Sequence, residues 1–153
     1  MLAYGVQSNS EDSRTREGLC IVRYLLAVPF VLLAALFSFS QNSAQYLACN
    51  EKAKAQPELN ACAKQEADRV DAQMNTVYKQ LVAKAASDPN DVAKIKAAER
   101  AWVAYRDAYI EATYPAADKQ AEYGSEYLMD VALLTARLTQ QHIADLQEML
   151  KQY

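Results

Sequence analysis

Residues that end or interrupt helices are scarce after the first forty positions of this 153-residue chain. From residue 41 onward there is one glycine, Gly124, and there are three prolines, Pro57, Pro89 and Pro115. Glycine and proline are the strongest local signals for turns and helix ends. Between them alanine is frequent, and apolar residues nowhere alternate with the period of two that a half-buried strand requires. The sequence therefore predicts an all-α fold.

Three long segments lie between these breakers. The first is expected to begin at Pro57, which suits the first helical turn, and to end near residue 86. The second is expected to begin with Asp88 as its N-cap and to end near residue 114. The third follows Gly124, with Ser125 as its candidate cap, and reaches almost to the C-terminus.

Each segment carries apolar residues at steps of three and four, which places them on one face of a helix. The apolar face of the second segment includes Trp102, Tyr105 and Tyr109, and that of the third begins with Leu128. Three amphipathic helices of matched length with short links favour an up-down-up antiparallel three-helix bundle. A short helical segment is expected to precede it.

Residues 1–40 have the pattern of a signal peptide. Arginines precede an apolar run over residues 24–39, and Ser38 and Ser40 provide the small residues that a signal peptidase recognises before its cleavage site. The run is shorter than a spanning helix needs. We therefore expect cleavage after Ser40 and export of residues 41–153 as one periplasmic or secreted domain. A lipid anchor at Cys49 fits poorly, because Tyr46 and Leu47 precede it, so membrane contact is expected only through the leader or such an anchor.

The charge balance and the missing motifs exclude several classes of function. The net charge is -3, which argues against a nucleic-acid partner. The sequence has no phosphate-binding loop, metal-ligand cluster or nucleophile elbow, so no catalytic residue, cofactor or metal site is expected. The only histidine, His142, lies among polar residues and is expected on a solvated face. Asp107 and Glu111 share a helical face as an acid pair would, but such pairs are common on exposed helices.

Two cysteines follow the leader, Cys49 and Cys62. Their spacing is not that of a redox motif, and no histidine lies near them in the sequence to complete a metal site. In a chain bound for an oxidising compartment they are expected to form a structural disulfide that ties the N-terminal segment to the first long helix.

Several local patterns occur together as they do in one known family. The most specific is the run from Glu99 to Ala108, Glu-Arg-Ala-Trp-Val-Ala-Tyr-Arg-Asp-Ala, with Cys49 and Cys62 before it and a Gly-Ser step at Gly124 after it. Residues 41–153 therefore resemble the LprI family of lysozyme inhibitors, which are small exported bacterial proteins. The resemblance implies a helical domain with cysteine pairs, no cofactor, and binding and inhibition of a lysozyme.

The chain departs from this family at a second cysteine pair, whose positions are occupied here by Ile110 and Leu134. A matched aliphatic pair restores contact energy but does not restrain the unfolded chain. We expect these two side chains to touch across the second and third helices.

Five residues of the family motifs are interpreted as structural: Trp102, Tyr105, Arg106, Asp107 and Gly124. Trp102 and Tyr105 lie on the apolar stripe and are expected in the core. The head of Arg106 is expected to pair with an acid of another helix, with Asp130 or Glu126 as candidates. Presentation of Arg106 to a ligand is the alternative, since arginine and tryptophan are common interface anchors.

The link between the second and third helices is the candidate binding surface. Between residues 107 and 130 there are six acidic residues and one cation, Lys119, with tyrosines interleaved. A negative patch steers a basic partner, and tyrosine offers a large contact area at low ordering cost. The candidate contact residues are Tyr114, Asp118, Lys119, Glu122, Tyr123, Glu126 and Tyr127.

The sequence thus predicts a non-catalytic inhibitor that occludes a lysozyme cleft, with Lys119 directed at the catalytic carboxylates of the enzyme. The alternative is an exported helical interaction module with another envelope protein or a cell-wall partner. In a third interpretation the tyrosines only pack the end of the bundle and the acids only solvate it.

Overall fold

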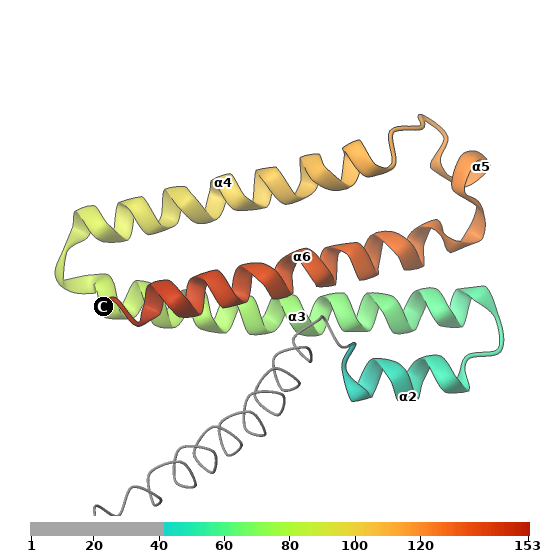
Figure 1. Ribbon diagram of the computed structural model, residues 1–153, viewed down its shortest axis with the longest axis horizontal. Coiled ribbons are helices and arrows are strands. Elements are labelled where there is room, and N and C mark those ends of the chain that lie inside the picture. The colour runs from blue at the N-terminus through green and yellow to red at the C-terminus, as the bar shows by residue number, and fades with distance from the viewer. Residues whose placement is uncertain (1–41) are drawn as a thin grey trace, which may run out of the picture. The chain divides into compact units, whose positions relative to one another are not determined.

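The structure is a computed structural model that describes residues 42–153, and the predicted signal peptide lies outside these residues. Throughout the described part the chain is helical and contains no strand, so the all-α prediction is confirmed. The long helices are α3 (Gln56–Lys84), α4 (Pro89–Thr113) and α6 (Tyr127–Leu150), and α2 (Ala44–Lys52) precedes them (Figure 1). None of the helices in residues 42–153 has the length and apolar character of a membrane span.

The predicted helix ends are close to the observed ones. Pro57 lies in the first turn of α3, and Asp88 caps α4 by accepting a hydrogen bond from the backbone N–H of Asn90 at 2.8 Å. Ser125 does not cap α6 as predicted, because it lies within a short 3-10 helix, η2 (Gly124–Glu126). Another 3-10 turn, η1 (Ala85–Ser87), connects α3 to α4.

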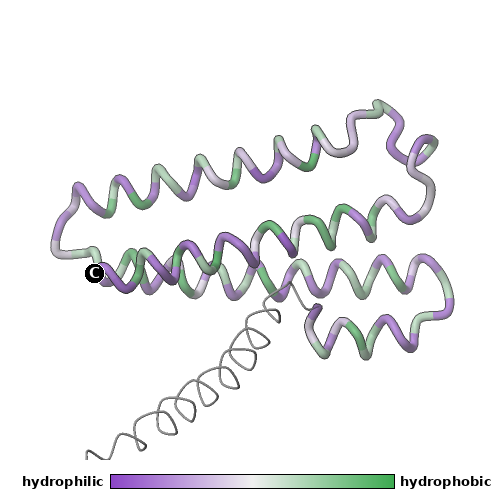
Figure 2. Tube along the Cα trace, viewed as in Figure 1, coloured by the Kyte–Doolittle hydropathy of each residue, from purple (hydrophilic) through white to green (hydrophobic). Residues whose placement is uncertain are grey.

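The core is an apolar seam between α3 and α6, which pack along their lengths. Val70, Met74 and Leu81 of α3 are buried against Ile143 and Leu146 of α6. The recurrence of apolar residues along each long helix is visible in Figure 2, where green positions alternate with purple ones. This seam buries much of the apolar face of α3 and the apolar face of the C-terminal half of α6.

The helix α4 contributes much less to the core. Ile95 is its only buried residue, with Val92 and Trp102 partly buried beside it. Two residues expected on its buried stripe are largely solvent-exposed instead: Tyr105 is 58% exposed and Tyr109 is 40% exposed. Leu128 at the start of α6 was also expected inside and is 57% exposed. These three expectations were wrong because a stripe shows which face of a helix is apolar, not whether another element covers it.

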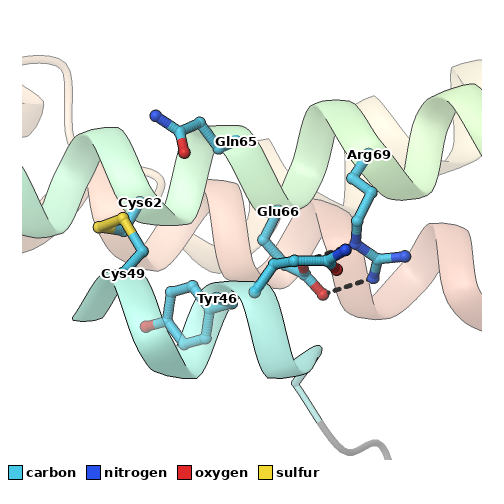
Figure 3. A pocket seen from close by; sticks show the side chains of 7 residues that line it. Tyr46, Cys49, Cys62, Gln65, Glu66 and Arg69 are labelled. Atoms are coloured by element: carbon cyan, nitrogen blue, oxygen red, sulfur yellow. Dashed lines mark hydrogen bonds and ion pairs between the residues drawn. A yellow bond between two sulfur atoms is a disulfide. The ribbon is translucent and has the colours of Figure 1, made fainter. Parts of the chain in front are cut away.

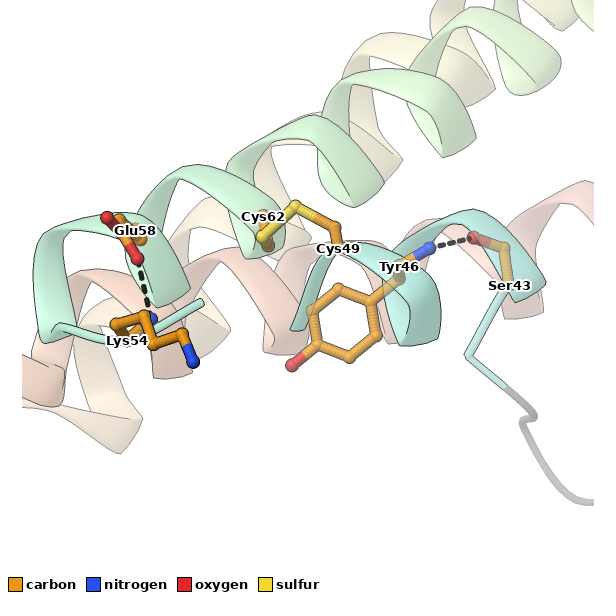
Figure 4. Close-up of a disulfide and its surroundings, with 6 residues drawn as sticks. All are labelled: Ser43, Tyr46, Cys49, Lys54, Glu58 and Cys62. Atoms are coloured by element: carbon orange, nitrogen blue, oxygen red, sulfur yellow. Dashed lines mark hydrogen bonds between the residues drawn. A yellow bond between two sulfur atoms is a disulfide. The ribbon is translucent and has the colours of Figure 1, made fainter. Parts of the chain in front are cut away.

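A disulfide and a buried carboxylate attach α2 to α3. Cys49 and Cys62 are bonded, with their Cα atoms 5.7 Å apart, as predicted (Figure 4). Tyr46 of α2 is buried beside Cys62 and Ala63. At the turn that follows α2, the backbone N–H of Lys54 donates to Glu58 at 2.6 Å. The covalent bond thus holds α2 in place while the turn orients it.

Glu66 is the buried carboxylate, and it lies where α2 begins. Arg69 donates two hydrogen bonds to it, at 2.7 and 2.9 Å (Figure 3). Ser43 donates to the same carboxylate from both its hydroxyl and its backbone N–H. The same Ser43 hydroxyl caps α2 by accepting from the N–H of Tyr46. The hydrogen bonds from Arg69 and Ser43 outweigh the effect of burial and lower the pKa of Glu66 to about 2. Glu66 therefore fixes the first turn of α2 as an ionised group.

Replacing both cysteines, Cys49→Ala with Cys62→Ala, is expected to lower the free energy of unfolding by about 3 kcal/mol, because the disulfide closes a loop of about 14 residues in the unfolded chain. Urea denaturation of residues 41–153 followed by circular dichroism measures this. Reduction of the unmutated protein should reproduce the loss. Equal midpoints for the oxidised protein and the double variant would contradict the assigned role.

Replacing Glu66 by glutamine is expected to cost about 2 kcal/mol at pH 7, since Arg69 loses its charged partner. The pKa of Glu66 is lower in the folded than in the unfolded state, so its contribution is complete above about pH 5. It is lost as the pH falls toward 2. Denaturation curves of both proteins at a series of pH values should therefore converge in acid. A difference that is the same at pH 7 and pH 2, or equal to that of the exposed control Glu51→Gln, would refute this.

Candidate functional site

The link between α4 and α6 folds around three tyrosines. Tyr114, Tyr123 and Tyr127 are half-buried, and their ring centroids lie 5.2 to 5.8 Å apart. Tyr123 also accepts a hydrogen bond through its hydroxyl from the backbone N–H of Ala116, at 3.2 Å. Mutual packing of aromatic rings at this separation stabilises beyond the area that it buries. We call Tyr114, Tyr123 and Tyr127 the tyrosine cluster, and it makes the link a folded element.

A short helix not anticipated from the sequence lies inside the link. This helix, α5 (Lys119–Tyr123), begins at Asp118, whose carboxylate accepts from the N–H of Ala121 at 3.0 Å. Within η2, the carbonyl of Ser125 accepts a hydrogen bond from the side-chain amide of Asn60 on α3, at 3.1 Å. Asp118 thus has a structural task as a cap, and the link is fastened to α3 as well as to α4 and α6.

Gly124 occupies a backbone conformation that other residues rarely adopt. Its φ is 70° and its ψ is -165°, and no heavy atom lies within 4 Å of the position that a Cβ would take. Space is therefore available for a side chain, but the dihedral angles are essentially restricted to glycine. This gives a physical reason for the structural role expected of Gly124, which lets the chain turn from α5 into η2.

Lys119, the one cation of the link, is engaged within the molecule. Its ammonium group lies 2.9 Å from a carboxylate oxygen of Glu111 and also donates to the carbonyl oxygen of Tyr114. The hydrogen bond to Glu111 raises the pKa of Lys119. The lysine therefore connects the last turns of α4 to α5. Directing it at the carboxylates of a partner would require breaking both interactions.

Four of the six acidic residues between positions 107 and 130 form no ion pair within residues 42–153. Glu111 is paired with Lys119 and Asp107 with Arg106, but within residues 42–153 no ion pair involves the other four acids. These four are Asp118, Glu122, Glu126 and Asp130. The pKa of Tyr114 is raised by burial and by the negative charge of Asp130. The tyrosine cluster is thus an amphipathic surface surrounded by unpaired negative charge.

Sequence reasoning missed the contact that docks α4 on α6. The rings of Trp102 and His142 are stacked, with centroids 3.9 Å apart and planes inclined by 6°. The His142 Nε2 atom lies 2.9 Å from a carboxylate oxygen of Glu99. His142 is 9% exposed, so its predicted place on a solvated face was wrong. The spacing of the sequence could have indicated this burial. His142 is four residues from both Leu138 and Leu146, which are buried on α6, so the three side chains share one face of the helix.

Arg106 lies beside this contact. Its guanidinium carbon is 5.3 Å from the centroid of the Trp102 ring, and its nitrogens lie 2.9 Å from Asp107 and 3.9 Å from Asp71 of α3. The acids in reach are therefore Asp107 and Asp71, and the proposed pairing with Asp130 or Glu126 was wrong. Arg106 lies over the tryptophan ring, and a guanidinium in this position is attracted by the ring face.

The two aliphatic residues at the expected second cysteine positions, Ile110 and Leu134, are both half-buried on α4 and α6. Their mutual contact stays a prediction. In the described residues there is also no group of three or more histidine, cysteine, aspartate or glutamate side chains that could hold a metal ion.

Comparisons with known proteins place this chain in a family. Residues 49–146 match the family described as Lysozyme inhibitor LprI. The match covers well over half of the chain. The chain is also 32% identical over 111 residues to a protein of Rhizobium meliloti (strain 1021) described as Uncharacterized protein R02472, an alignment that spans 65% of this chain and 77% of the relative. No solved structure matches the chain. The resemblance inferred from the motifs is confirmed, and the chain belongs to the lysozyme inhibitor LprI family.

Proposed function

We propose that this protein is an exported inhibitor that binds a lysozyme through the acidic surface around the tyrosine cluster and acts by occlusion, without catalysis. Membership of the lysozyme inhibitor LprI family makes lysozyme the first candidate partner. The observation that carries the proposal is the set of unpaired carboxylates around three packed tyrosines at one end of the molecule.

Electrostatics favours a basic partner at this end. Asp118, Glu122 and Glu126 are exposed, and Asp130 is half-buried beside Tyr114. Lysozymes of animal hosts are generally basic proteins, and complementary charge raises the association rate and fixes the orientation of docking. Because none of these four carboxylates forms an ion pair within residues 42–153, each is available to pair with a cation of an incoming surface.

The tyrosine cluster supplies contact area for a partner and a rigid surface to bind it. The rings of Tyr114, Tyr123 and Tyr127 are held against one another before any partner arrives, so little conformational entropy is lost on binding. In this proposal the three long helices form an up-down-up frame that presents the cluster at one end. The link then covers the sugar-binding cleft of the enzyme.

The engagement of Lys119 with Glu111 changes the role that we propose for this residue. The lysine acts as a brace that holds α5 against the end of α4, and the contacts with the enzyme come from the acids and tyrosines around it. Removal of its charge would then weaken inhibition through loss of order in the link. It would not remove a direct contact with catalytic carboxylates.

Export is part of the proposal, since an inhibitor of lysozyme acts outside the cytoplasm. The disulfide between Cys49 and Cys62 supports it, because such bonds persist in oxidising compartments. A helical envelope module with another protein or a cell-wall partner is the alternative, and it would use the same surface.

Neutralising two exposed acids, Glu122→Gln with Glu126→Gln, is expected to weaken inhibition about tenfold at low salt and less at physiological salt, because screening already reduces the attraction there. The measurement is a titration of animal lysozyme activity with oxidised residues 41–153. The matched control is Glu51→Gln with Asp145→Asn, which changes the net charge equally at exposed positions on α2 and the C-terminal half of α6.

The measurement distinguishes an error in the assigned binding surface from an error in the proposed function. Equal inhibition by the test and control variants would refute the acidic surface as the binding site. No inhibition by the unmutated protein at micromolar excess would refute the inhibitor function and favour the envelope module.

A further inference from the structure

The middle of α4 is joined to α6 by one histidine that lies between two side chains of α4. The rings of His142 and Trp102 stack with their centroids 3.9 Å apart, and the imidazole Nε2 atom lies 2.9 Å from a carboxylate oxygen of Glu99. Glu99 and Trp102 are three residues apart on α4, so they share one face of the helix. Ile95 is the only buried residue that α4 supplies besides this contact. The position of α4 therefore depends strongly on His142.

The carboxylate of Glu99 depends on His142 for a partner. The Glu99 side chain is 13% exposed and that of His142 is 10% exposed, and within residues 42–153 the only ion pair of Glu99 is the one with His142. A carboxylate that is removed from water is costly unless a positive charge lies beside it. A protonated imidazole supplies that charge, whereas a neutral imidazole supplies only a hydrogen bond.

The tryptophan ring also favours a protonated imidazole, because a cation over the face of an indole is attracted by the ring. The opposing influence is Arg106, whose guanidinium carbon lies 5.3 Å from the centroid of the same Trp102 ring. The charge of Arg106 is compensated by Asp107 at 2.9 Å and by Asp71 of α3 at 3.9 Å. The cation that opposes protonation is thus paired with acids of its own.

The other titratable groups near this contact do not take its place. On α6, Asp145 lies three residues after His142 and is exposed to water. On α3, Tyr78 packs against the same core as Trp102, and a side chain of its type carries no charge near neutral pH. The Nδ1 atom of His142 has no hydrogen bond to the protein but is not buried, since within residues 42–153 the only buried side-chain polar atom without a partner is the Thr139 hydroxyl. A proton can therefore reach the imidazole without displacement of α4.

We propose that this contact is a pH-sensitive switch, in which a proton on His142 fastens α4 to α6 and loss of that proton loosens it. Protonation converts the hydrogen bond to Glu99 into an ion pair that is largely shielded from water, and it adds the attraction of the Trp102 ring. Histidine suits this task because its ordinary titration, at about pH 6.5, lies close to neutrality. The inference goes beyond the proposed inhibition, because it concerns how α4 is held and requires no particular partner.

The direction of the effect follows from which state of the chain binds the proton more tightly. In the unfolded chain His142 has neither Glu99 nor Trp102 beside it, whereas in the folded chain both favour the proton. The stability gained is therefore complete well below about pH 6.5 and is lost as the pH rises toward about 8. Glu66 does not obscure this change, because its pKa of about 2 keeps it ionised throughout the range.

The chain contains its own probe of the contact, because Trp102 is its only tryptophan and His142 its only histidine. A protonated imidazole in contact with an indole quenches its fluorescence more strongly than a neutral one. Titration of oxidised residues 41–153 from about pH 8 to about pH 5.5 should therefore show one transition, with weaker emission in acid, and His142→Gln should abolish it. Glu99→Gln keeps a hydrogen-bond acceptor but loses the charge, so it should lower the midpoint of the transition by about one pH unit. The control Glu51→Gln, at an exposed position on α2, should leave the midpoint unchanged.

Urea denaturation of the same proteins shows whether the proton stabilises the fold. The loss of stability caused by His142→Gln is expected to be greater at about pH 5.5 than at about pH 8, by about fivefold in the equilibrium constant of unfolding. An equal loss at both pH values would overturn the proposal, and so would an emission transition that survives in the His142→Gln variant. A greater loss at the higher pH would also overturn it, because the neutral imidazole would then be the form that holds α4. Neither measurement involves a lysozyme, so failure of the inhibition assay would leave this result standing.

Discussion

Burial of the apolar seam between α3 and α6 is the interaction on which the other parts of the molecule depend. Val70 and Leu81 on α3 are almost completely removed from water, and Leu146 on α6 packs with them. Burial of such side chains contributes about 1.5 to 3 kcal/mol each, more than any surface ion pair of this protein. The helices α2 and α4 have no comparable core of their own. Each is attached to the seam by a small number of specific contacts.

The two attachments use different chemistry. The helix α2 is held by a covalent bond and by Glu66, an ionised carboxylate whose oxygens are occupied by Arg69 and Ser43. The helix α4 is held by the stack of Trp102 on His142, by Ile95 and by the connection through η1. The first attachment restrains the chain even when it is unfolded, and the second exists only in the folded state. The tyrosine cluster, which lies beyond the end of α4, therefore depends for its position on the weaker attachment and on the hydrogen bond from Asn60.

Much of the fold could be predicted from the sequence because its signals are local. Proline in the first turn of α3 and the Asp88 cap mark helix ends through interactions within a few residues. The disulfide could be predicted because residues 41–153 contain only two cysteines. The partner of Arg106 could not, because Asp71 becomes its neighbour only through the approach of α4 to α3.

The sequence predicts which residue types form the candidate site, but it predicts few of the contacts between them. The acids and tyrosines of the link are evident in the sequence, and the structure brings Tyr114, Tyr123 and Tyr127 together. The pairing of Lys119 with Glu111 spans eight residues across a bend that no helical period describes. The burial of His142 was missed because its polar neighbours in sequence lie on other faces of α6.

The Trp102–His142 stack divides α4 into two parts that are held in different ways. Between Trp102 and Thr113, where the helix ends, α4 extends about 16 Å at 1.5 Å per residue, and none of its residues is buried there. This part is held at its far end instead, where Lys119 pairs with Glu111 and Tyr114 packs against Tyr127 at the start of α6. The tyrosine cluster therefore does for the end of α4 what the stack does for its middle, and a change in the cluster would alter the separation of α4 from α6.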